Sequence, residues 1–129
     1  MPLVNISLLD NRTADMKKQI VEQVHAAMRE ALKIPAHDIN FRMHEFSREN
    51  FIYPAERSDN YMVVEFTLFK GRSFETKRSL YKRIVDNLST IGIEPRDVFI
   101  VLNDIEMENW GVRGGIPASE VQFNFDVNI

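Results

Sequence analysis

Pro2 has unusual chemical potential in this sequence, because removal of Met1 would leave its nitrogen as a free secondary amine. Inside a chain a proline nitrogen is an amide without useful basicity, whereas a free α-amino group titrates at roughly 7.7–8.0. A free Pro2 could therefore take up and release a proton near neutral pH. The alternative is structural, since proline is well tolerated at the first residue of a strand.

Arg72 and Trp110 are further candidates by position alone. Arg72 stands at the expected start of a helix, where a cation opposes the helix dipole, and this unfavourable placement favours a functional role. Its counterpart Arg12 shares that position in an earlier copy of the same pattern. Trp110 is the single tryptophan and adjoins a glycine-rich loop. It could wall a pocket or pack in a core or an interface.

Metal and cofactor chemistry is not indicated. There is no cysteine, which removes thiolate nucleophiles, disulfides and cysteine-ligated metals together. His25, His37 and His44 do not have metal-ligand spacing, and the glycines after Trp110 neither follow a strand nor open a helix as in a nucleotide-phosphate loop. We therefore expect no metal and no cofactor.

The composition is that of an ordinary globular protein. The chain has 129 residues with 44% hydrophobic and 27% charged content, a size typical of a single domain over residues 1–129. A net charge of −3 with interspersed signs argues against nucleic acid as a partner. Neither a leader nor a long apolar run is evident, so we expect a cytoplasmic protein without a membrane partner.

Two copies of one pattern, residues 2–46 and 61–103, must position these candidates. Each copy reads as strand, amphipathic helix and strand, with period-two alternation in the strands and apolar spacings of three and four in the helix. The expected strands lie within residues 2–9, 39–43, 62–68 and 98–102, and the expected helices follow Thr13 and Ser73. The sequence thus predicts an α+β fold in which a duplicated β-α-β unit forms a four-stranded mixed sheet with both helices on one face.

Three regions of this arrangement carry further expectations. The second sheet face is partly apolar, which is typical of an oligomer contact. Residues 47–60 contain aromatics and paired charges and should form an ordered excursion. In the C-terminal extension, residues 104–129, a strict apolar and polar alternation over 121–129 predicts a strand that could add to a neighbouring subunit's sheet.

These features together resemble the tautomerase superfamily, whose members use an N-terminal proline and assemble as trimers of duplicated units. Within it the chain is most similar to the malonate semialdehyde decarboxylase branch and its uncharacterised relatives. The resemblance covers nearly the whole chain and implies a homotrimer that needs no cofactor. It is carried by Pro2, the turn from Ile34 and Pro35 to Asp38, the segment Lys70 to Ser73, and the segment Asn109 to Gly111 with the glycines after it.

The resemblance also implies roles for individual residues. Pro2 would be the acid and base, Asp38 its neighbouring carboxylate, and Arg72 the group that holds a substrate carboxylate. Lys70 stands where the decarboxylases have a second arginine. Lysine keeps the charge but loses the planar two-pronged hydrogen bonding of a guanidinium. Structural alternatives remain for each residue, since Asp38 also suits a turn and Lys70 suits an exposed strand end.

Keto-enol tautomerisation of a small 2-oxo acid is the leading prediction, with Pro2 as general acid and base. A cation beside the proline would lower its pKa and favour this base chemistry, whereas a close Asp38 would raise it and favour decarboxylation of a 3-oxo acid. A third reading is a trimeric binding or signalling module, as the resemblance to macrophage migration inhibitory factor allows. A fourth is an unrelated ferredoxin-like sensor of small molecules.

Overall fold

The computed structural model describes residues 2–129. The condition that Met1 is removed, which a free Pro2 nitrogen requires, concerns a residue outside the described range. Its four-stranded sheet has the order β2-β1-β3-β4. The strands are β1 (Leu3–Leu9), β2 (Phe41–Phe46), β3 (Met62–Phe69) and β4 (Val98–Ile105). β1 runs parallel to β2 and antiparallel to β3, and β3 runs parallel to β4. The predicted mixed sheet of two β-α-β units is confirmed.

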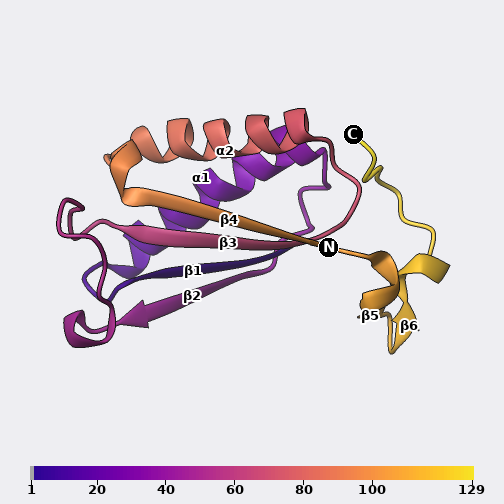
Figure 1. The fold of residues 1–129 in the computed structure, drawn as a ribbon, viewed down its shortest axis with the longest axis horizontal. Coiled ribbons are helices and arrows are strands. Elements are labelled where there is room, and N and C mark those ends of the chain that lie inside the picture. Colours follow the sequence, from indigo (N-terminus) through magenta and orange to yellow (C-terminus); the bar gives the residue numbers. More distant parts are fainter. Residues whose placement is uncertain (1) are drawn as a thin grey trace.

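Both long helices begin at the predicted caps. In α1 (Ala14–Leu32) the Thr13 hydroxyl accepts a hydrogen bond from the Met16 N–H, and in α2 (Phe74–Ser89) the Ser73 hydroxyl accepts one from Thr76. Each cap satisfies one of the N–H groups that a helix leaves unpaired at its start. The two helices lie side by side on one face of the sheet, as Figure 1 shows. Neither helix of the described chain has the length and apolar content that a membrane crossing requires.

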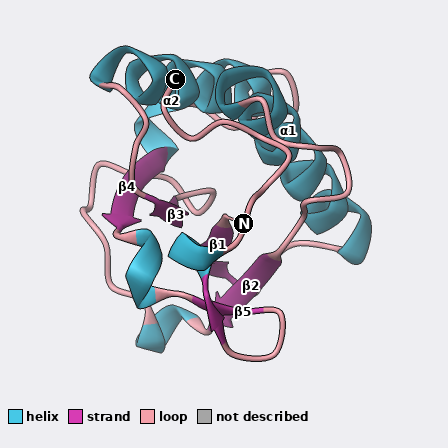
Figure 2. Ribbon diagram, turned by 90° about the vertical axis from the view of Figure 1, so that its right-hand side faces the viewer, coloured by secondary structure: helices cyan, strands magenta, loops and turns pink. Residues whose placement is uncertain are grey.

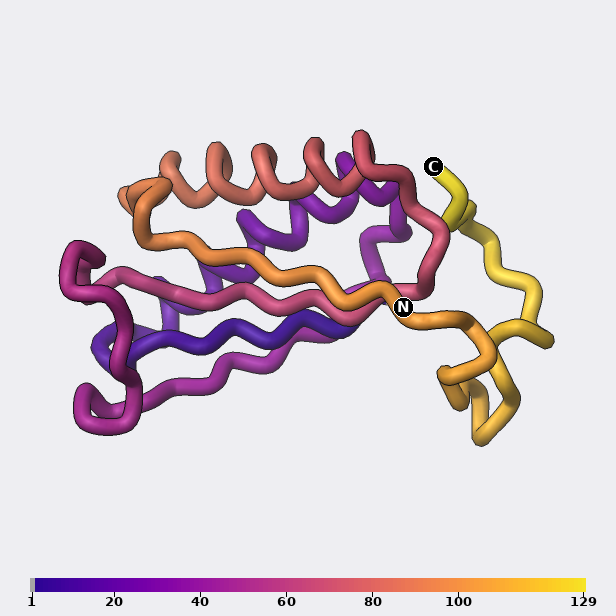
Figure 3. Tube along the Cα trace, viewed as in Figure 1, coloured from indigo at the N-terminus to yellow at the C-terminus, as the bar shows by residue number. Residues whose placement is uncertain are grey.

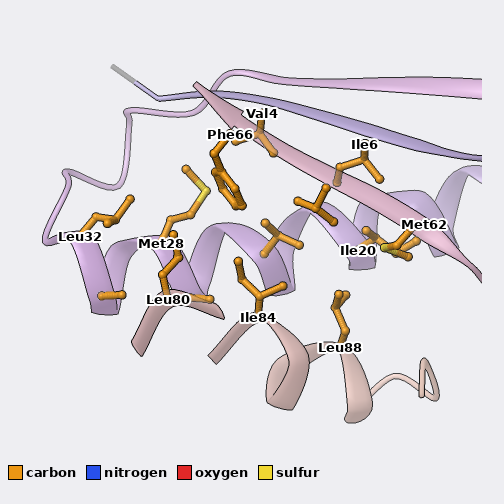
Figure 4. Packing of buried hydrophobic residues seen from close by; sticks show 14 of the residues in the cluster. Val4, Ile6, Ile20, Met28, Leu32, Met62, Phe66, Leu80, Ile84 and Leu88 are labelled. Atoms are coloured by element: carbon orange, nitrogen blue, oxygen red, sulfur yellow. The ribbon is translucent and has the colours of Figure 1, made fainter. Parts of the chain in front are cut away.

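The core lies between the two helices and the sheet (Figure 4). From the sheet, Val4, Ile6 and Phe66 are fully buried, and from the helices Ile20 and Leu80 meet them. Alternate strand residues therefore point to the helices, as the period of two requires. This packed layer fixes the ends of the strands, where the polar candidates lie.

The C-terminal extension folds at one end of the sheet, beside the N-terminus, as the trace in Figure 3 shows. It contains a small hairpin of β5 (Gly111–Val112) and β6 (Ile116–Pro117). The strand predicted over 121–129 does not form in the single chain. Its alternation instead packs Phe123 and Phe125 against Phe69, with ring centroids 5.2 and 6.4 Å away. Within the single chain these aromatics therefore contact a side chain rather than a strand edge, and pairing of this segment with the sheet of a neighbouring subunit stays a prediction.

Residues 47–60 form an ordered excursion at the opposite end of the sheet. Arg48 and Asp59 pair at 2.7 Å, and the Tyr53 and Tyr61 rings stack with centroids 5.1 Å apart. Aromatic stacking and a two-pronged ion pair explain why this segment is not a loose linker. The remaining short elements are 3-10 helices at Arg48–Asn50, Pro95–Asp97, Met107–Asn109 and Ala118–Glu120.

Candidate active site

A cavity of about 560 Å³ lies at the end of the sheet where β1 and β2 begin. Figure 2 looks at this end and shows the N-terminus above β5 and below the helices. We call this space the Pro2 cavity. Three segments distant in sequence enclose it: the start of β1, the turn before β2, and the C-terminal extension. Its lining residues are Pro2, Leu3, Pro35, His37, Asp38, Ile39, Asn40, Trp110, Gly111, Val112, Arg113, Phe123, Asn124 and Phe125.

Pro2 and Asp38 come together because β1 and β2 are parallel. The residues that precede two parallel strands meet at the same sheet edge, and here the Val4 N–H donates to the Asn40 carbonyl at 3.0 Å. The Asp38 N–H donates to the Pro35 carbonyl at 3.1 Å, which closes the turn that carries Asp38. Pro2, which is buried, and Asp38 therefore both line the cavity.

Trp110 lines the cavity and packs at the same time. Its ring meets Phe69 edge-on with centroids 4.8 Å apart, and its indole N–H donates to the Ile105 carbonyl at 3.3 Å. The two alternatives for Trp110, pocket wall and packing residue, thus both apply to the same side chain.

Arg72 is buried behind the cavity and is not among its lining residues. Its side chain is only 5% exposed, and Nη1 donates to the Phe69 carbonyl at 3.2 Å. Nε and Nη2 are enclosed and have no hydrogen-bond partner in the described chain. Burial lowers the pKa of Arg72 below its ordinary value, while the charges of Asp38 and Asp126 oppose this shift. Arg72 is therefore an electrostatic neighbour of Asp38 rather than a cavity wall.

Lys70 points to another partner. Its Nζ lies 2.8 Å from Glu106 Oε1 in an exposed ion pair, and this hydrogen bond raises the pKa of Lys70. Lys70 does not line the cavity either. Of the five sequence-derived site residues, the structure brings Pro2, Asp38 and Trp110 to the cavity and leaves Arg72 and Lys70 outside its walls.

The other end of the sheet holds the counterparts Arg12 and Asp97. Both are buried, and the Arg12 Nη2 donates to the Asn60 carbonyl at 2.7 Å. The Ser58 N–H donates to Asp97 Oδ1 at 2.8 Å, and the Ser58 hydroxyl donates to Oδ2. This pair thus secures the excursion to the sheet, which is a structural task.

Sequence reasoning missed several cavity residues. Phe123 and Phe125 were assigned to a strand, although their alternation did signal a buried side. Arg113 was not singled out, and its signal was present in the sequence: a charged residue directly before two glycines and three positions after the only tryptophan. Residues 2–129 contain no cluster of side chains that could hold a metal ion.

Comparison with known proteins agrees with this fold. A family model described as "Tautomerase enzyme" matches residues 38–113, and a second model with the same description matches residues 2–59. Since the first match covers more than half of the chain, the protein belongs to the tautomerase family. It is an enzyme of the tautomerase type.

The chain is also similar to individual tautomerase-type proteins. The chain is 29% identical over 121 residues to "Probable tautomerase YusQ" of Bacillus subtilis (strain 168), covering 89% of this chain and 95% of that protein. A crystal structure of FG41 malonate semialdehyde decarboxylase inhibited by 3-bromopropiolate is 26% identical, with a TM-score of 0.83 over 94% of this chain and 98% of the other. A trimer named fused 4-OT shares the fold at 23% identity, with a TM-score of 0.79 over 91% and 96% of the two chains.

Proposed function

We propose that this protein interconverts the keto and enol forms of a small 2-oxo acid, with the Pro2 nitrogen as the acid and base. The observation that carries the proposal is that Pro2 lines the 560 Å³ cavity together with Asp38. A volume between about 300 and 1,000 Å³ is typical of a ligand pocket. The tautomerase relatives support this reaction class.

The proposed step moves one proton and needs no cofactor. The neutral Pro2 nitrogen removes the proton from the carbon next to the keto group, the electrons of that C–H bond form the enol double bond, and the π electrons of the carbonyl move onto its oxygen. The protonated Pro2 then donates the same proton to that oxygen and becomes neutral again. General acid and base catalysis of this kind contributes typically about 10²–10⁴-fold to a rate. Asp38 orients the protonated amine, and the positive charge of Arg72 behind it offsets the negative charge of the carboxylate.

Decarboxylation of a 3-oxo acid is the second candidate. The similarity to malonate semialdehyde decarboxylase favours it, and so does the Asp38 carboxylate in the cavity, which would keep the proline protonated. A protonated Pro2 would polarise the 3-oxo group while the carbon–carbon bond to the carboxylate breaks, and the electrons of that bond would form an enol. Carbon dioxide would then leave.

The test follows ketonisation of an enol of a substituted pyruvate by ultraviolet absorbance. Mass spectrometry of the same sample must first show that Met1 is absent, because an acylated Pro2 nitrogen has no basicity. We expect Pro2→Ala to lose about 100-fold or more in rate. Pro54→Ala, in the excursion at the other end of the sheet, is the matched control and should keep wild-type activity.

The outcomes separate the two reactions. A processed wild type that is no faster than buffer over several aryl and alkyl enols would refute the tautomerase proposal. If it instead releases carbon dioxide from a 3-oxo acid in a Pro2-dependent way, the second candidate is supported. An unchanged decarboxylation rate in Lys70→Ala would show that Lys70 does not bind that substrate.

We also propose that the protein acts in the cytoplasm as a homotrimer, with a small oxo acid as its ligand. The support is the partly apolar sheet face that the helices leave open, on which Phe99 and Val101 are 51% and 37% exposed. Apolar faces of this kind are typical of contacts between subunits.

A further inference from the structure

Among the described residues that line the Pro2 cavity, Arg113 is the single lysine or arginine. It follows β5 in the loop of the small hairpin, and the Gly115 N–H donates to the Val112 carbonyl at 3.0 Å to close this loop. Lys70 and Arg72, the cations expected to bind a substrate, lie outside the cavity walls. Apart from a protonated Pro2 nitrogen, the permanent positive charge in the described lining therefore belongs to Arg113.

The backbone at Arg113 is unfavourable for a residue with a side chain. The three residues that connect β5 and β6 all have positive φ: 50° at Arg113, 81° at Gly114 and 103° at Gly115. Glycine adopts such a conformation freely, whereas a residue with a Cβ pays roughly 1–2 kcal/mol. An arginine in this position is thus disfavoured by local conformation, which points to a task for its side chain.

The Arg113 guanidinium is positioned but unpaired. Its Cζ lies 5.5 Å from the centroid of the Phe123 ring, a cation–π contact that holds the group at the cavity wall. Within residues 2–129 the guanidinium makes no side-chain hydrogen bond and no ion pair, and the residue is exposed. A guanidinium can donate two parallel hydrogen bonds to a carboxylate, and these donors are available here.

The other walls indicate what the carboxylate should be attached to. Trp110, Phe123 and Phe125 present aromatic surface, and Leu3, Ile39 and Val112 add aliphatic surface. Asp38 is the acidic residue in the lining, so a second negative charge on the ligand would be repelled. At about 560 Å³ the space also exceeds what a three-carbon acid would fill.

We propose that Arg113 binds the substrate carboxylate, so that the cavity selects monocarboxylates with an apolar body larger than three carbons. As a statement about substrate, the proposal rests on the function proposed above. Arg113 is a binding residue in this account, and Pro2 remains the acid and base. Selectivity for size comes from the aromatic walls, and selectivity for charge comes from Arg113 and Asp38, which both line the cavity.

The test measures binding without turnover. Because Trp110 is the only tryptophan and lines the cavity, its fluorescence reports occupancy. The probe is 3-phenylpropionate, which has an apolar body and a carboxylate but no keto group, and 3-phenylpropionamide is its uncharged counterpart. We expect wild type to bind the acid more tightly than the amide, and to lose this preference as salt is raised.

Two variants remove the charge in different ways. Arg113→Gln keeps much of the side-chain length, and Arg113→Asn introduces a residue that tolerates positive φ well, so the loop conformation is retained. Both should weaken acid binding about tenfold or more and leave amide binding unchanged. The matched control is Arg78→Gln, since Arg78 also stacks on a phenylalanine, with Cζ 4.6 Å from the Phe74 centroid, but lies on α2 outside the cavity.

Every result bears on the proposal. The proposal is overturned if wild type and Arg113→Asn bind the acid with equal affinity. It is also overturned if wild type does not prefer the acid to the amide, or if wild type does not bind the acid at all. If enol ketonisation is absent but acid binding still depends on Arg113, the proposed function fails while the assignment of Arg113 holds. If ketonisation depends on Pro2 but has the same KM in Arg113→Asn as in wild type, the proposed function holds and the assignment of Arg113 fails.

Discussion

Asp38 and Asp97 hold equivalent positions in the two β-α-β units, yet their surroundings differ. Asp97 is 1% exposed and accepts two hydrogen bonds from Ser58. Asp38 lies in the lining of the Pro2 cavity, next to the buried charge of Arg72. One copy of the duplicated residue thus supports the excursion, while the other faces the cavity.

This contrast leads to opposite expectations for the two isosteric variants. Asp97→Asn should lower the free energy of unfolding by roughly 1–3 kcal/mol, because an amide cannot accept from both Ser58 donors as the carboxylate does. Asp38→Asn should change stability less and enol ketonisation more. Urea unfolding and rate measurements on both variants are the check. A larger stability loss for Asp38→Asn would contradict this division of tasks.

Candidate residues can be selected from the sequence where their chemistry is tied to a position in the chain. Pro2 is such a candidate, because removal of Met1 would give it the free α-amino group of the chain. Arg113 cannot be selected in this way, because its candidacy as a binding residue depends on which cationic side chains line the cavity, and that requires the structure. The sequence alone also could not tell that burial would turn Arg72 toward the Phe69 carbonyl.

At the scale of elements, one ion pair ties α2 to β4. Lys77 Nζ lies 2.6 Å from Asp104 Oδ2, and this hydrogen bond lowers the pKa of Asp104. A lowered folded-state pKa means that the stabilisation is present above the unfolded value of about 3.9 and is lost as the pH falls through the folded value. The contact therefore contributes at neutral pH and not in acid.

Asp104→Asn should accordingly reduce the free energy of unfolding by about 0.5–1 kcal/mol at pH 7, a typical value for a partly exposed pair. The difference from wild type should shrink toward zero as both are unfolded by urea at pH values approaching 2. Asp86→Asn, which breaks a pair within α2 only, should have a smaller effect at pH 7. A wild-type advantage that grows in acid would show that the sign is wrong.

Gly71 allows the C-terminal segment to pass close to the end of β3. Its φ is +146°, and a Cβ at this position would lie 2.8 Å from the Val127 carbonyl oxygen. Gly71→Ala should therefore displace residues 123–127 from Phe69 and destabilise the protein by more than about 1 kcal/mol. Limited proteolysis of the C-terminal segment and urea unfolding measure the two effects.

Gly92→Ala is the control for backbone strain, since Gly92 has a φ of +88° but nothing within 4 Å of an added Cβ. It should cost stability without exposing the C-terminal segment to protease. Equal protection of that segment in Gly71→Ala and wild type would contradict the close approach at Gly71. The sequence reveals the caps and strands of this region but not this contact, because it joins residues more than fifty positions apart.

On the scale of the whole molecule, the helices cover one face of the sheet and leave the other face open (Figure 1). Phe99 and Val101 of β4 are exposed. If this face joins the subunits of a trimer, Phe99→Glu should yield monomers, because burying an unpaired carboxylate costs several kcal/mol. Size-exclusion chromatography with light scattering gives the mass of each form.

Phe74→Glu is the matched control, since Phe74 is 66% exposed but lies on α2, away from the open face. It should keep the mass of wild type. A Phe99→Glu protein that retains the wild-type mass would show that this face is not the subunit contact.

The architecture was the most predictable part of the molecule. Duplication, the two caps and the period-two strands all indicate one arrangement, and agreement between levels of this kind is what specifies a fold. The end of the chain was less predictable, because an alternation of aromatic and polar residues suits a strand and a packed irregular segment alike.

The Pro2 cavity is enclosed by residues 2–3 at one end of the chain and residues 123–125 near the other. During synthesis the amino-terminal part emerges first, and the sheet and both helices are complete within residues 3–105. A nascent polypeptide can thus bury its hydrophobic interior well before its binding chamber has a complete wall. A ribosome-tethered chain that ends shortly after β4 should therefore be folded yet inactive.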